Sequence, residues 1–333
     1  MRTIKYLLAL VVIGGILMIS CDKDIETESV QNPYTYSDLY YQNLRDYKAS
    51  DHEIAFGWFA QYGAQNSLGV RFMGLPDSLD ICSMWGGIPA KENTAIWEEI
   101  RFVQKVKGTK MLAVAITRID AETDDHDFKK AYNEARQMPA GEEKTAAINR
   151  AIEMYAEYFL DQVFENDLDG FDADYEPEGD FLSGSYFVHF YKYMAKYMGP
   201  NPDITQEERL ALIQERYGKG VTDTKKLLNI DQTSTGMVEL APYSNYCFLQ
   251  AYGGGTGAGS WPNEKVVYCC NMGDNWKGNM STMYTQARYK PANGRKGGFG
   301  AFFIHRDYNV HENNPSPYKR FRECIQIQNP AVY

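Results

Sequence analysis

The sequence predicts one closed (β/α)8 barrel, also called a TIM barrel, and three observations support this fold. Short apolar segments of strand length alternate with amphipathic segments of helix length, which is typical of parallel strands joined by helical crossovers. Eight such strand segments are present, and glycine pairs mark the ends of several of them. The length of 333 residues and the apolar content of 44% are sufficient for one large barrel domain.

The eight predicted strands follow one another within residues 34–333, which form the predicted barrel domain. They are Glu53–Phe59, Leu79–Trp85, Met111–Thr117, Gly170–Glu176, Leu227–Asp231, Tyr246–Tyr252, Lys265–Asn271 and Gly298–His305. Each is followed by a segment long enough for a crossover, so the strands are expected to close into a barrel.

Apolar residues recur at helical spacing in three of the connecting segments. These predicted helices are Lys91–Val106, Thr145–Phe164 and Tyr186–Tyr197. An open doubly wound sheet is the alternative architecture. The first predicted strand, however, is not followed by the glycine-rich dinucleotide loop that is typical of that fold.

The overall charge excludes one class of partner, and the aromatic content favours another. The formal net charge is −10, which argues against nucleic acid, because phosphates require a basic surface. The chain has 25 tyrosines. A tyrosine side chain combines a flat apolar face with a hydroxyl group, which suits the binding of sugars.

The N-terminal residues 1–20 are expected to be a signal peptide and not part of the fold. Arg2 and Lys5 precede an apolar run that is too short for a comfortable membrane span. The run ends before Cys21, in a pattern that resembles a bacterial lipoprotein signal. Residues 21–33 then read as an acidic tether from a lipidated Cys21. A cleaved secretory signal with an incidental cysteine is the alternative.

This N-terminus predicts a protein held at the bacterial outer membrane, on the cell surface, through its lipid anchor alone. The acidic residues after Cys21 resemble those of surface-exported lipoproteins of Bacteroidetes-type bacteria. The other five cysteines have neither the spacing of a zinc site nor an even number, so they are expected to be buried apolar residues. No metal or nucleotide cofactor is expected.

The most informative segment is the predicted fourth strand, with its acidic side chains at alternate positions. Since side chains on a strand alternate between its faces, Asp172, Asp174 and Glu176 share one face. The other face carries Phe171 and its apolar neighbours, which suit packing against helices. The acidic face is therefore expected to point into the barrel. Carboxylates are costly there unless they are protonated, hydrogen-bonded or paired.

Like charges so close together cannot all ionise easily, so at least one of these carboxyl groups is expected to have a raised pKa. A carboxyl group that holds its proton at neutral pH can deliver it to a leaving oxygen. Glu176 is the last acid of the strand and therefore the nearest to the barrel mouth. It is the predicted proton donor.

Two other interpretations of the acidic segment fit less well. A calcium-binding loop requires glycine at its sixth position, where this segment has Asp172 or Pro177, depending on where the loop is taken to start. An acidic surface loop would not interleave its acids with Phe171, Ala173 and Tyr175.

The segment LDGFDADYEP resembles the fourth-strand signature of glycoside hydrolase family 18, in which acids recur in the pattern DGxDxDxE. Asp169, Asp172, Asp174 and Glu176 fill every acidic position of that pattern. Two later segments, QAYGG at 250–254 and GGFGAFFIHRDY at 297–308, resemble motifs of its endo-β-N-acetylglucosaminidase branch. The resemblance is nearest to lipoprotein members from glycan-utilisation clusters of gut Bacteroides.

The resemblance implies a retaining mechanism in which the 2-acetamido oxygen of the substrate is the nucleophile. Glu176 would protonate the glycosidic oxygen, and Asp174 would orient the acetamido N–H group. Asp172 would tune the protonation of Asp174, and Tyr252 would donate its hydroxyl to the acetamido oxygen. Gln250, on the same face of the predicted strand as Tyr252, would hold that sugar.

Further substrate-binding residues are expected near the C-terminal ends of the strands, where barrel enzymes place their sites. They are Trp58, Trp85, Asn271 and His305, and Asp169 joins them through its place in the motif. Trp261 and Trp276 are expected on the cleft wall. The longest polar spacer, Asp120–Lys144, and the short early loops favour an open cleft.

Three functions are consistent with these residues. The first is an endo-β-N-acetylglucosaminidase that cuts a β-1,4 bond at N-acetylglucosamine in N-glycans. The second is a non-catalytic surface glycan-binding protein on the same barrel, and the third is a chitinase-like enzyme. The complete acidic motif favours catalysis, because an unused cluster of buried acids costs stability. A glycan is the expected partner, with neighbouring glycan-uptake proteins as further candidates.

Overall fold

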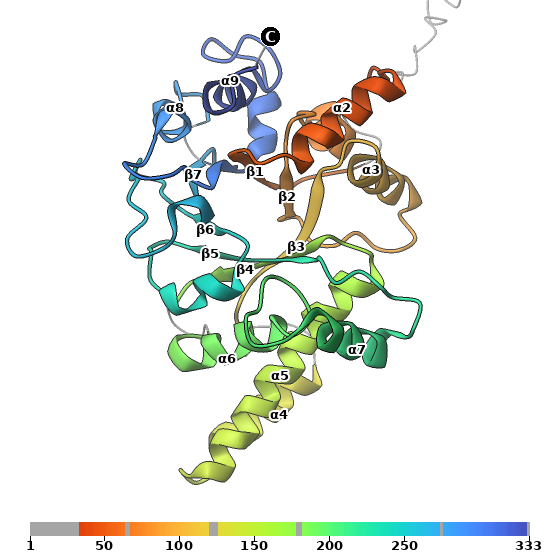
Figure 1. Cartoon of the computed structure of the whole chain (residues 1–333), viewed down its shortest axis with the longest axis vertical. Helices are drawn as coiled ribbons and strands as arrows, with labels where there is room; N and C mark the ends of the chain where they lie inside the picture. The colour runs from red at the N-terminus through yellow and green to blue at the C-terminus, as the bar shows by residue number, and fades with distance from the viewer. Residues whose placement is uncertain (1–32, 64–66, 120–125, 178–181, 274–275, 332–333) are drawn as a thin grey trace, which may run out of the picture.

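A computed structural model describes residues 33–63, 67–119, 126–177, 182–273 and 276–331 of the chain. Eight parallel strands close into a barrel in sequence order, which confirms the predicted (β/α)8 fold (Figure 1). The strands are β1 Ile54–Phe59, β2 Ile81–Met84, β3 Lys110–Ile116, β4 Gly170–Tyr175, β5 Leu227–Gln232, β6 Cys247–Leu249, β7 Val266–Asn271 and β8 Gly298–Phe302.

Helices cover most of the barrel wall but not all of it. They are α2 Asp38–Ala49, α3 Thr94–Lys105, α4 Asp127–Gln137, α5 Glu142–Glu165, α6 Gly184–Met194, α7 Gln206–Tyr217, α8 Ser281–Arg288 and α9 Lys319–Gln328. Within the described residues, the β1–β2, β5–β6 and β6–β7 connections contain 3₁₀ turns and no α-helix. The β6–β7 connection contains five glycines between 253 and 259, and glycine disfavours helix.

The polar spacer Asp120–Lys144 contains a helix that the sequence analysis did not identify. Its described part forms α4 and the start of α5, and α4 packs against α5. The α5 helix has 24 residues, which makes it roughly 36 Å long at 1.5 Å per residue. Together the two helices project from the barrel (Figure 1).

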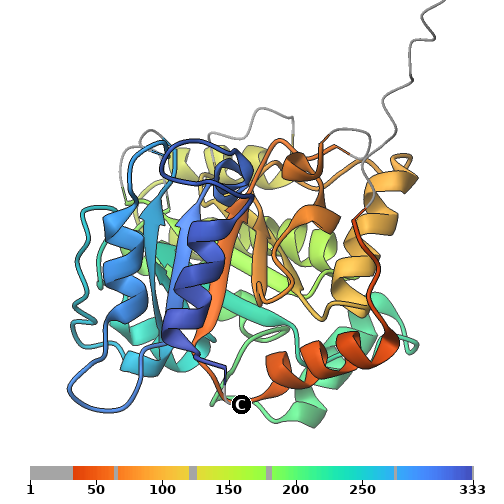
Figure 2. The same cartoon turned by 90° about the horizontal axis from the view of Figure 1, so that it is seen from above.

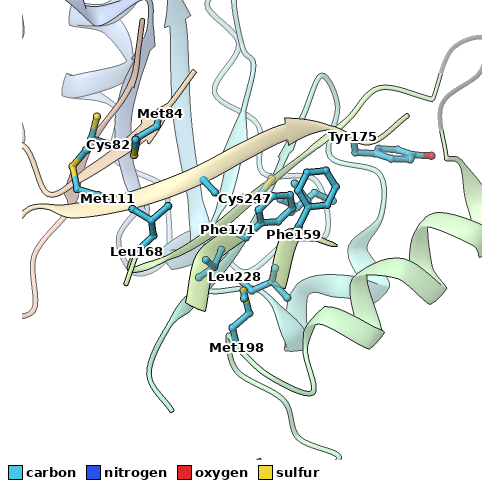
Figure 3. Packing of buried hydrophobic residues seen from close by; sticks show 14 of the residues in the cluster. Cys82, Met84, Met111, Phe159, Leu168, Phe171, Tyr175, Met198, Leu228 and Cys247 are labelled. Carbon is cyan, nitrogen blue, oxygen red and sulfur yellow. The ribbon is translucent and has the colours of Figure 1, made fainter. Parts of the chain in front are cut away.

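Alternation along the strands separates two apolar cores. On β1, Ile54, Phe56 and Trp58 face the lumen and belong to a small inner cluster. The larger outer cluster fills the space between strands and helices, and it includes Phe171 and Tyr175 of β4 (Figure 3). The prediction that the apolar face of this strand packs against helices is therefore confirmed.

A buried ion pair joins the first and last strands at the N-terminal end of the barrel. Lys296, just before β8, is fully buried and donates to the carboxylate of Glu53, just before β1. Asn329, after α9, donates to the carbonyl of Glu53 and to the hydroxyl of Tyr47 on α2. The chain just after α9 therefore lies beside the end of α2 (Figure 2).

Two predicted strands end earlier than expected. β6 ends at Leu249, because the amides of Ala251 and Tyr252 turn back onto the carbonyls two residues before them. β8 ends at Phe302, because Phe303 adopts a left-handed conformation with φ 56°. The five predicted apolar cysteines are all free and buried, as expected.

The signal peptide, Cys21 and almost all of the predicted tether lie outside the described residues. None of the helices within the described ranges combines the length and apolar character that a bilayer-spanning segment requires.

Candidate active site

Four carboxyl groups line the barrel lumen and rise toward its C-terminal mouth. Asp172 and Asp174 lie on β4, Asp231 lies on β5, and Glu176 follows β4 directly. The three aspartates are buried, whereas the side chain of Glu176 is 34% exposed. Glu176 is therefore the carboxyl group of the four that a molecule in the mouth would meet first.

Asp172 is the deepest of these acids, and two side chains from neighbouring strands fix it. The indole Nε1 of Trp58 donates to its Oδ2 at 3.0 Å, and the hydroxyl of Ser83 donates to the same oxygen at 2.6 Å. Its other oxygen is buried and accepts no hydrogen bond from a described residue. That oxygen is positioned to carry a proton.

Asp174 and Asp231 stand opposite each other in the parallel register of β4 and β5. The side-chain amide of Gln250, just after β6, donates to both: at 2.9 Å to Asp231 Oδ1 and at 3.3 Å to Asp174 Oδ1. Three adjacent strands therefore meet in one hydrogen-bonded group. One amide donor for two buried carboxylates leaves the second oxygen of Asp174 without a donor among the described residues.

Burial raises the pKa of all three aspartates, because desolvation disfavours their charged forms. Repulsion adds to this effect: Glu176 and then Asp172 raise the pKa of Asp174, and Asp174 raises the pKa of Asp231. The hydrogen bonds from Ser83 and Trp58 work in the opposite direction on Asp172. The buried group therefore retains protons at neutral pH, as the sequence predicted for this strand.

Arg118, which follows β3, provides positive charge at the mouth. Its guanidinium lies 4.0 Å from a carboxylate oxygen of Glu176, and both side chains are partly exposed. An exposed pair at this distance contributes little to stability. Its effect is to orient Glu176 and to offset some of the negative charge, since Arg118 also lowers the pKa of Asp174.

Tyr252 borders the same group from the turn after β6. Burial, followed by the charge of Asp231, raises the pKa of its hydroxyl well above the usual value, so the group remains a proton-bearing donor. The tyrosine lines a cavity of about 350 Å³ together with Asn271 and the 278–282 segment. Both predicted residues thus lie in one recess of the barrel mouth.

Asp169 does not belong to the site, and its predicted contact with substrate is wrong. It precedes β4, at the opposite end of the strand from Glu176, roughly 20 Å away at about 3.3 Å per residue. There its carboxylate accepts hydrogen bonds from Gln104, from Lys110 and from the amide of Met111. Asp169 therefore fixes β4 against β3.

Two of the predicted aromatic contacts are also wrong, because the rings are buried. Trp58 is 1% exposed and sits under Asp172, so its ring faces are not available to a sugar. Trp261 is 3% exposed, and its indole donates to the carbonyl of Gly236. Trp58 contributes to the site as a hydrogen-bond donor, and Trp261 packs the β6–β7 connection against the β5–β6 connection.

The remaining predicted contacts are near the mouth. Trp85 is half-buried, and its ring meets that of Phe302 at 5.3 Å. Phe302 also contacts the ring of Tyr252 at 6.3 Å. His305 is buried in the short 3₁₀ segment after β8 and lines a second cavity with Trp276.

The sequence analysis missed Asp231, Ser83 and Arg118 as site residues. Asp231 could have been found by the alternation that identified β4, since Asn229 and Asp231 occupy alternate positions and both are buried. Ser83 and Arg118 carried no such signal. Their contacts depend on how neighbouring strands are staggered in the closed barrel.

A cavity larger than the one at Tyr252 lies away from these residues. It has a volume of about 610 Å³ and lies on the flank of the barrel, between the start of α2 and α9. This is beside the β1–β2 connection, which lacks an α-helix in its described part. No member of the acidic group lines this cavity, so its size carries no argument about catalysis.

A family model and a curated protein match most of the chain. The model for glycoside hydrolase family 18, BT1044-like, matches residues 21–263. The chain is 25% identical to endo-beta-N-acetylglucosaminidase F2 of Elizabethkingia meningoseptica over 359 residues. That match covers 94% of this chain and 95% of the relative.

Two solved structures have the same fold over most of their length. A selenomethionine variant of BT1044 aligns with a TM-score of 0.64 at 20% identity, covering 88% of this chain and 93% of its own. The apo endo-beta-N-acetylglucosaminidase of Cordyceps militaris aligns with a TM-score of 0.58 at 20% identity, covering 90% of this chain and 99% of its own.

Proposed function

The chain belongs to glycoside hydrolase family 18, in its BT1044-like group, and on this premise we propose that it is an endo-β-N-acetylglucosaminidase that cuts the GlcNAc–GlcNAc bond of N-glycans. Membership makes it a glycoside hydrolase that acts on glycans containing N-acetylglucosamine. The endo-β-N-acetylglucosaminidase activity is supported by the name of the Elizabethkingia relative, and the choice of N-glycans by the resemblance of the motif that contains Gln250 and Tyr252.

In the first step, Glu176 acts as the general acid. It gives its proton to the glycosidic oxygen while the bond from that oxygen to C1 breaks. The acetamido oxygen of the same sugar attacks C1 and forms a cyclic oxazolinium ion. Asp174 accepts a hydrogen bond from the acetamido N–H group and stabilises the positive charge. Glu176 is placed for this role because it is the exposed acid of the group.

In the second step, water opens the oxazolinium ion, and Glu176, now a carboxylate, takes a proton from that water. The configuration at C1 is retained, because the anomeric carbon is inverted twice. Tyr252 donates its hydroxyl to the acetamido oxygen, which needs most stabilisation as it develops charge. The raised pKa of Tyr252 keeps its proton available for that hydrogen bond.

The buried acids act behind these residues. Asp172 is fixed by Trp58 and Ser83 and shares the raised pKa of the group, so it can hold a proton when Asp174 is charged. Asp231 holds the amide of Gln250, and Gln250 in turn holds Asp174. This arrangement keeps Asp174 in one orientation while its protonation changes.

The observation that carries the proposal is the convergence of Asp174, Gln250 and Tyr252 below an exposed Glu176. The test is incubation of protein starting at residue 34 with high-mannose and complex N-glycoproteins, followed by mass spectrometry of released glycans. Release by the wild type and not by Glu176→Gln is the expected result. The mass of the product identifies the bond that is cut.

Two other outcomes would reject the proposal in different ways. Binding of a glycan without release, by both proteins, would indicate a surface glycan-binding protein with an idle acidic motif. Release of chitooligosaccharides from chitin, with no action on glycoproteins, would indicate a chitinase-like enzyme.

We further propose that Cys21 carries a lipid that anchors the enzyme at the outer membrane. The support is the apolar run before Cys21 and the acidic residues after it. Full-length protein is expected in the membrane fraction of a bacterial host. Cys21→Ser is expected to abolish labelling by a radioactive fatty acid, and equal labelling of both proteins would reject the anchor.

A further inference from the structure

A second recess opens at the barrel mouth, beside the ends of β1, β7 and β8. It has a volume of about 330 Å³, and its lining includes Gln61, Trp276, His305 and Asn309. These residues follow the C-terminal ends of their strands, as do Tyr252 and Glu176. The recess therefore opens on the catalytic side of the barrel. Its volume is at the lower end of the range for ligand cavities, about 300–1,000 Å³.

His305 is the unusual member of this lining. It is 5% exposed, and neither ring nitrogen has a hydrogen-bond partner among the described residues. Burial, aided by the nearby charge of Arg306, lowers its pKa to about 4, so the imidazole is neutral at pH 7. A neutral imidazole offers one donor and one acceptor. Burying both unpaired is costly, so a molecule that reaches the ring from the recess and hydrogen-bonds to it would be bound favourably.

A row of aromatic rings leads from the catalytic centre to this recess. The ring of Tyr252 lies 6.3 Å from that of Phe302, which stacks on Phe303 at 3.9 Å. Phe303 in turn lies 5.2 Å from the ring of His305. Apolar ring faces and edges are the surfaces on which sugar rings pack. The row thus has the character of a track for an extended glycan.

Backbone strain coincides with the recess. Phe303 has φ 56° and Gln61 has φ 60°, a left-handed conformation that is unfavourable for residues other than glycine. Such conformations persist where the surrounding structure requires them, and they cluster at binding sites. Here the turn at Phe303 directs the chain inward after β8, so that His305 becomes buried against Phe59.

We propose that this recess, which Arg306 also lines, is an outer subsite that binds one pyranose unit of the glycan, with His305 hydrogen-bonded to its hydroxyls and Trp276 packed on its ring. The amides of Gln61 and Asn309 supply further uncharged donors and acceptors. Trp276 is half-buried, so part of its ring remains accessible. The proposal rests on the hydrolase function and adds where the far end of the substrate is held.

The test compares an intact N-glycan with the same glycan trimmed to its core. His305→Phe keeps a ring but removes both polar nitrogens, and it is expected to raise KM for the intact glycan about tenfold more than KM for the trimmed one. His305→Gln, which keeps a donor and an acceptor, is expected to restore most of the difference. His189→Phe, on the outer helix α6, is the matched control. It is expected to leave KM unchanged for both the intact and the trimmed glycan.

A second readout does not need turnover. In a Glu176→Gln background, the intact glycan is expected to change tryptophan fluorescence more than the trimmed glycan does. Trp276→Phe is expected to remove that difference, whereas Trp97→Phe on α3 is expected to retain it. If His305→Phe changes KM for the intact and the trimmed glycan by the same factor, the subsite is overturned, even if the wild type cleaves both glycans. If wild type cleaves nothing but binds glycan, the hydrolase proposal fails, and weaker binding by His305→Phe still supports the subsite. Absence of any glycan binding would overturn both.

Discussion

Asp174 and Asp231 face each other across adjacent strands and share a single amide donor, that of Gln250. Burial raises the pKa of both, with mutual repulsion as a further cause. The pair consequently binds protons below the reaction centre at a higher pH than free aspartates do. Its protonation state therefore affects both the stability of the protein and the catalytic step, and it makes both depend on pH.

Replacement of Asp231 by asparagine is expected to stabilise the protein increasingly as pH rises. A carboxyl group whose folded pKa is raised contributes stability below its unfolded pKa and loses it as pH rises through the folded value. The wild-type protein therefore loses stability as pH rises, because Asp231 ionises. The Asp231→Asn variant does not, because an amide side chain does not ionise. The measurement is the difference in Tm between Asp231→Asn and wild type from pH 5 to 9.

The control for this experiment is a carboxyl group whose pKa is shifted in the opposite direction. The pKa of Glu323 is lowered by hydrogen bonds from Lys319 and Tyr284, so its contribution is present above its unfolded pKa. Glu323→Gln is expected to give a constant, slightly lower Tm over the same range. A pH-independent difference for Asp231→Asn would contradict the buried-proton interpretation.

Replacement of Glu176 by glutamine is expected to lower kcat by about 10²–10⁴-fold, the usual contribution of a positioned general acid. Substrate binding should be retained, because the amide keeps the size and polarity of the side chain. The measurement is kcat and Kd on one glycopeptide. Glu142→Gln, at the start of α5 and exposed, serves as the control. An unchanged kcat in Glu176→Gln would exclude Glu176 as the general acid.

Tyr252→Phe is expected to lower kcat by about 10²-fold with little change in KM, because its hydroxyl acts mainly on charge that develops in the transition state. Tyr268→Phe is a matched control, since Tyr268 is buried on β7 and its hydroxyl has no partner among the described residues. Removing that hydroxyl should leave kcat unchanged and stability unchanged or higher. An equal loss of kcat in both variants would argue against a specific role for Tyr252.

A comparison of two buried serines distinguishes an effect on stability from an effect on catalysis. Ser83 donates to Asp172, whereas Ser244 donates to the carbonyl of Leu240, and both are fully buried. Each serine-to-alanine change should cost about 1–2 kcal/mol of stability, the penalty for an unpaired buried partner. Only Ser83→Ala should also lower kcat, by about tenfold. Denaturant unfolding and initial rates test both parts, and equal rates in the two variants would refute the role of Ser83.

The sequence predicted those features that depend on local alternation. The acids of β4 could be assigned to one face because Phe171, Ala173 and Tyr175 occupy the other, and the structure places those three in the outer core. Asp169 was misassigned because its motif position does not reveal that a strand separates it from the mouth. The bounds of β6 and β8 were overestimated because apolar residues continue past Leu249 and Phe302, where the backbone turns.

Features that depend on the closed barrel could not be predicted from the pattern of residues along the sequence. The burial of Trp58 depends on the stagger that brings β1 level with Asp172. The partnership of Asp231 with Gln250 depends on adjacent strands whose order only barrel closure defines. The helix-free connections reflect tertiary packing in addition to composition.

The ion pair between Glu53 and Lys296 has a consequence for how the chain matures. Its partners are separated by 243 positions, so the first strand has no partner on one edge until nearly the whole chain has been synthesised. An unpaired strand edge is a template for association with other chains. Newly made chains that stop before Lys296 should therefore be prone to aggregation and depend on chaperones, because only β8 covers the free edge of β1.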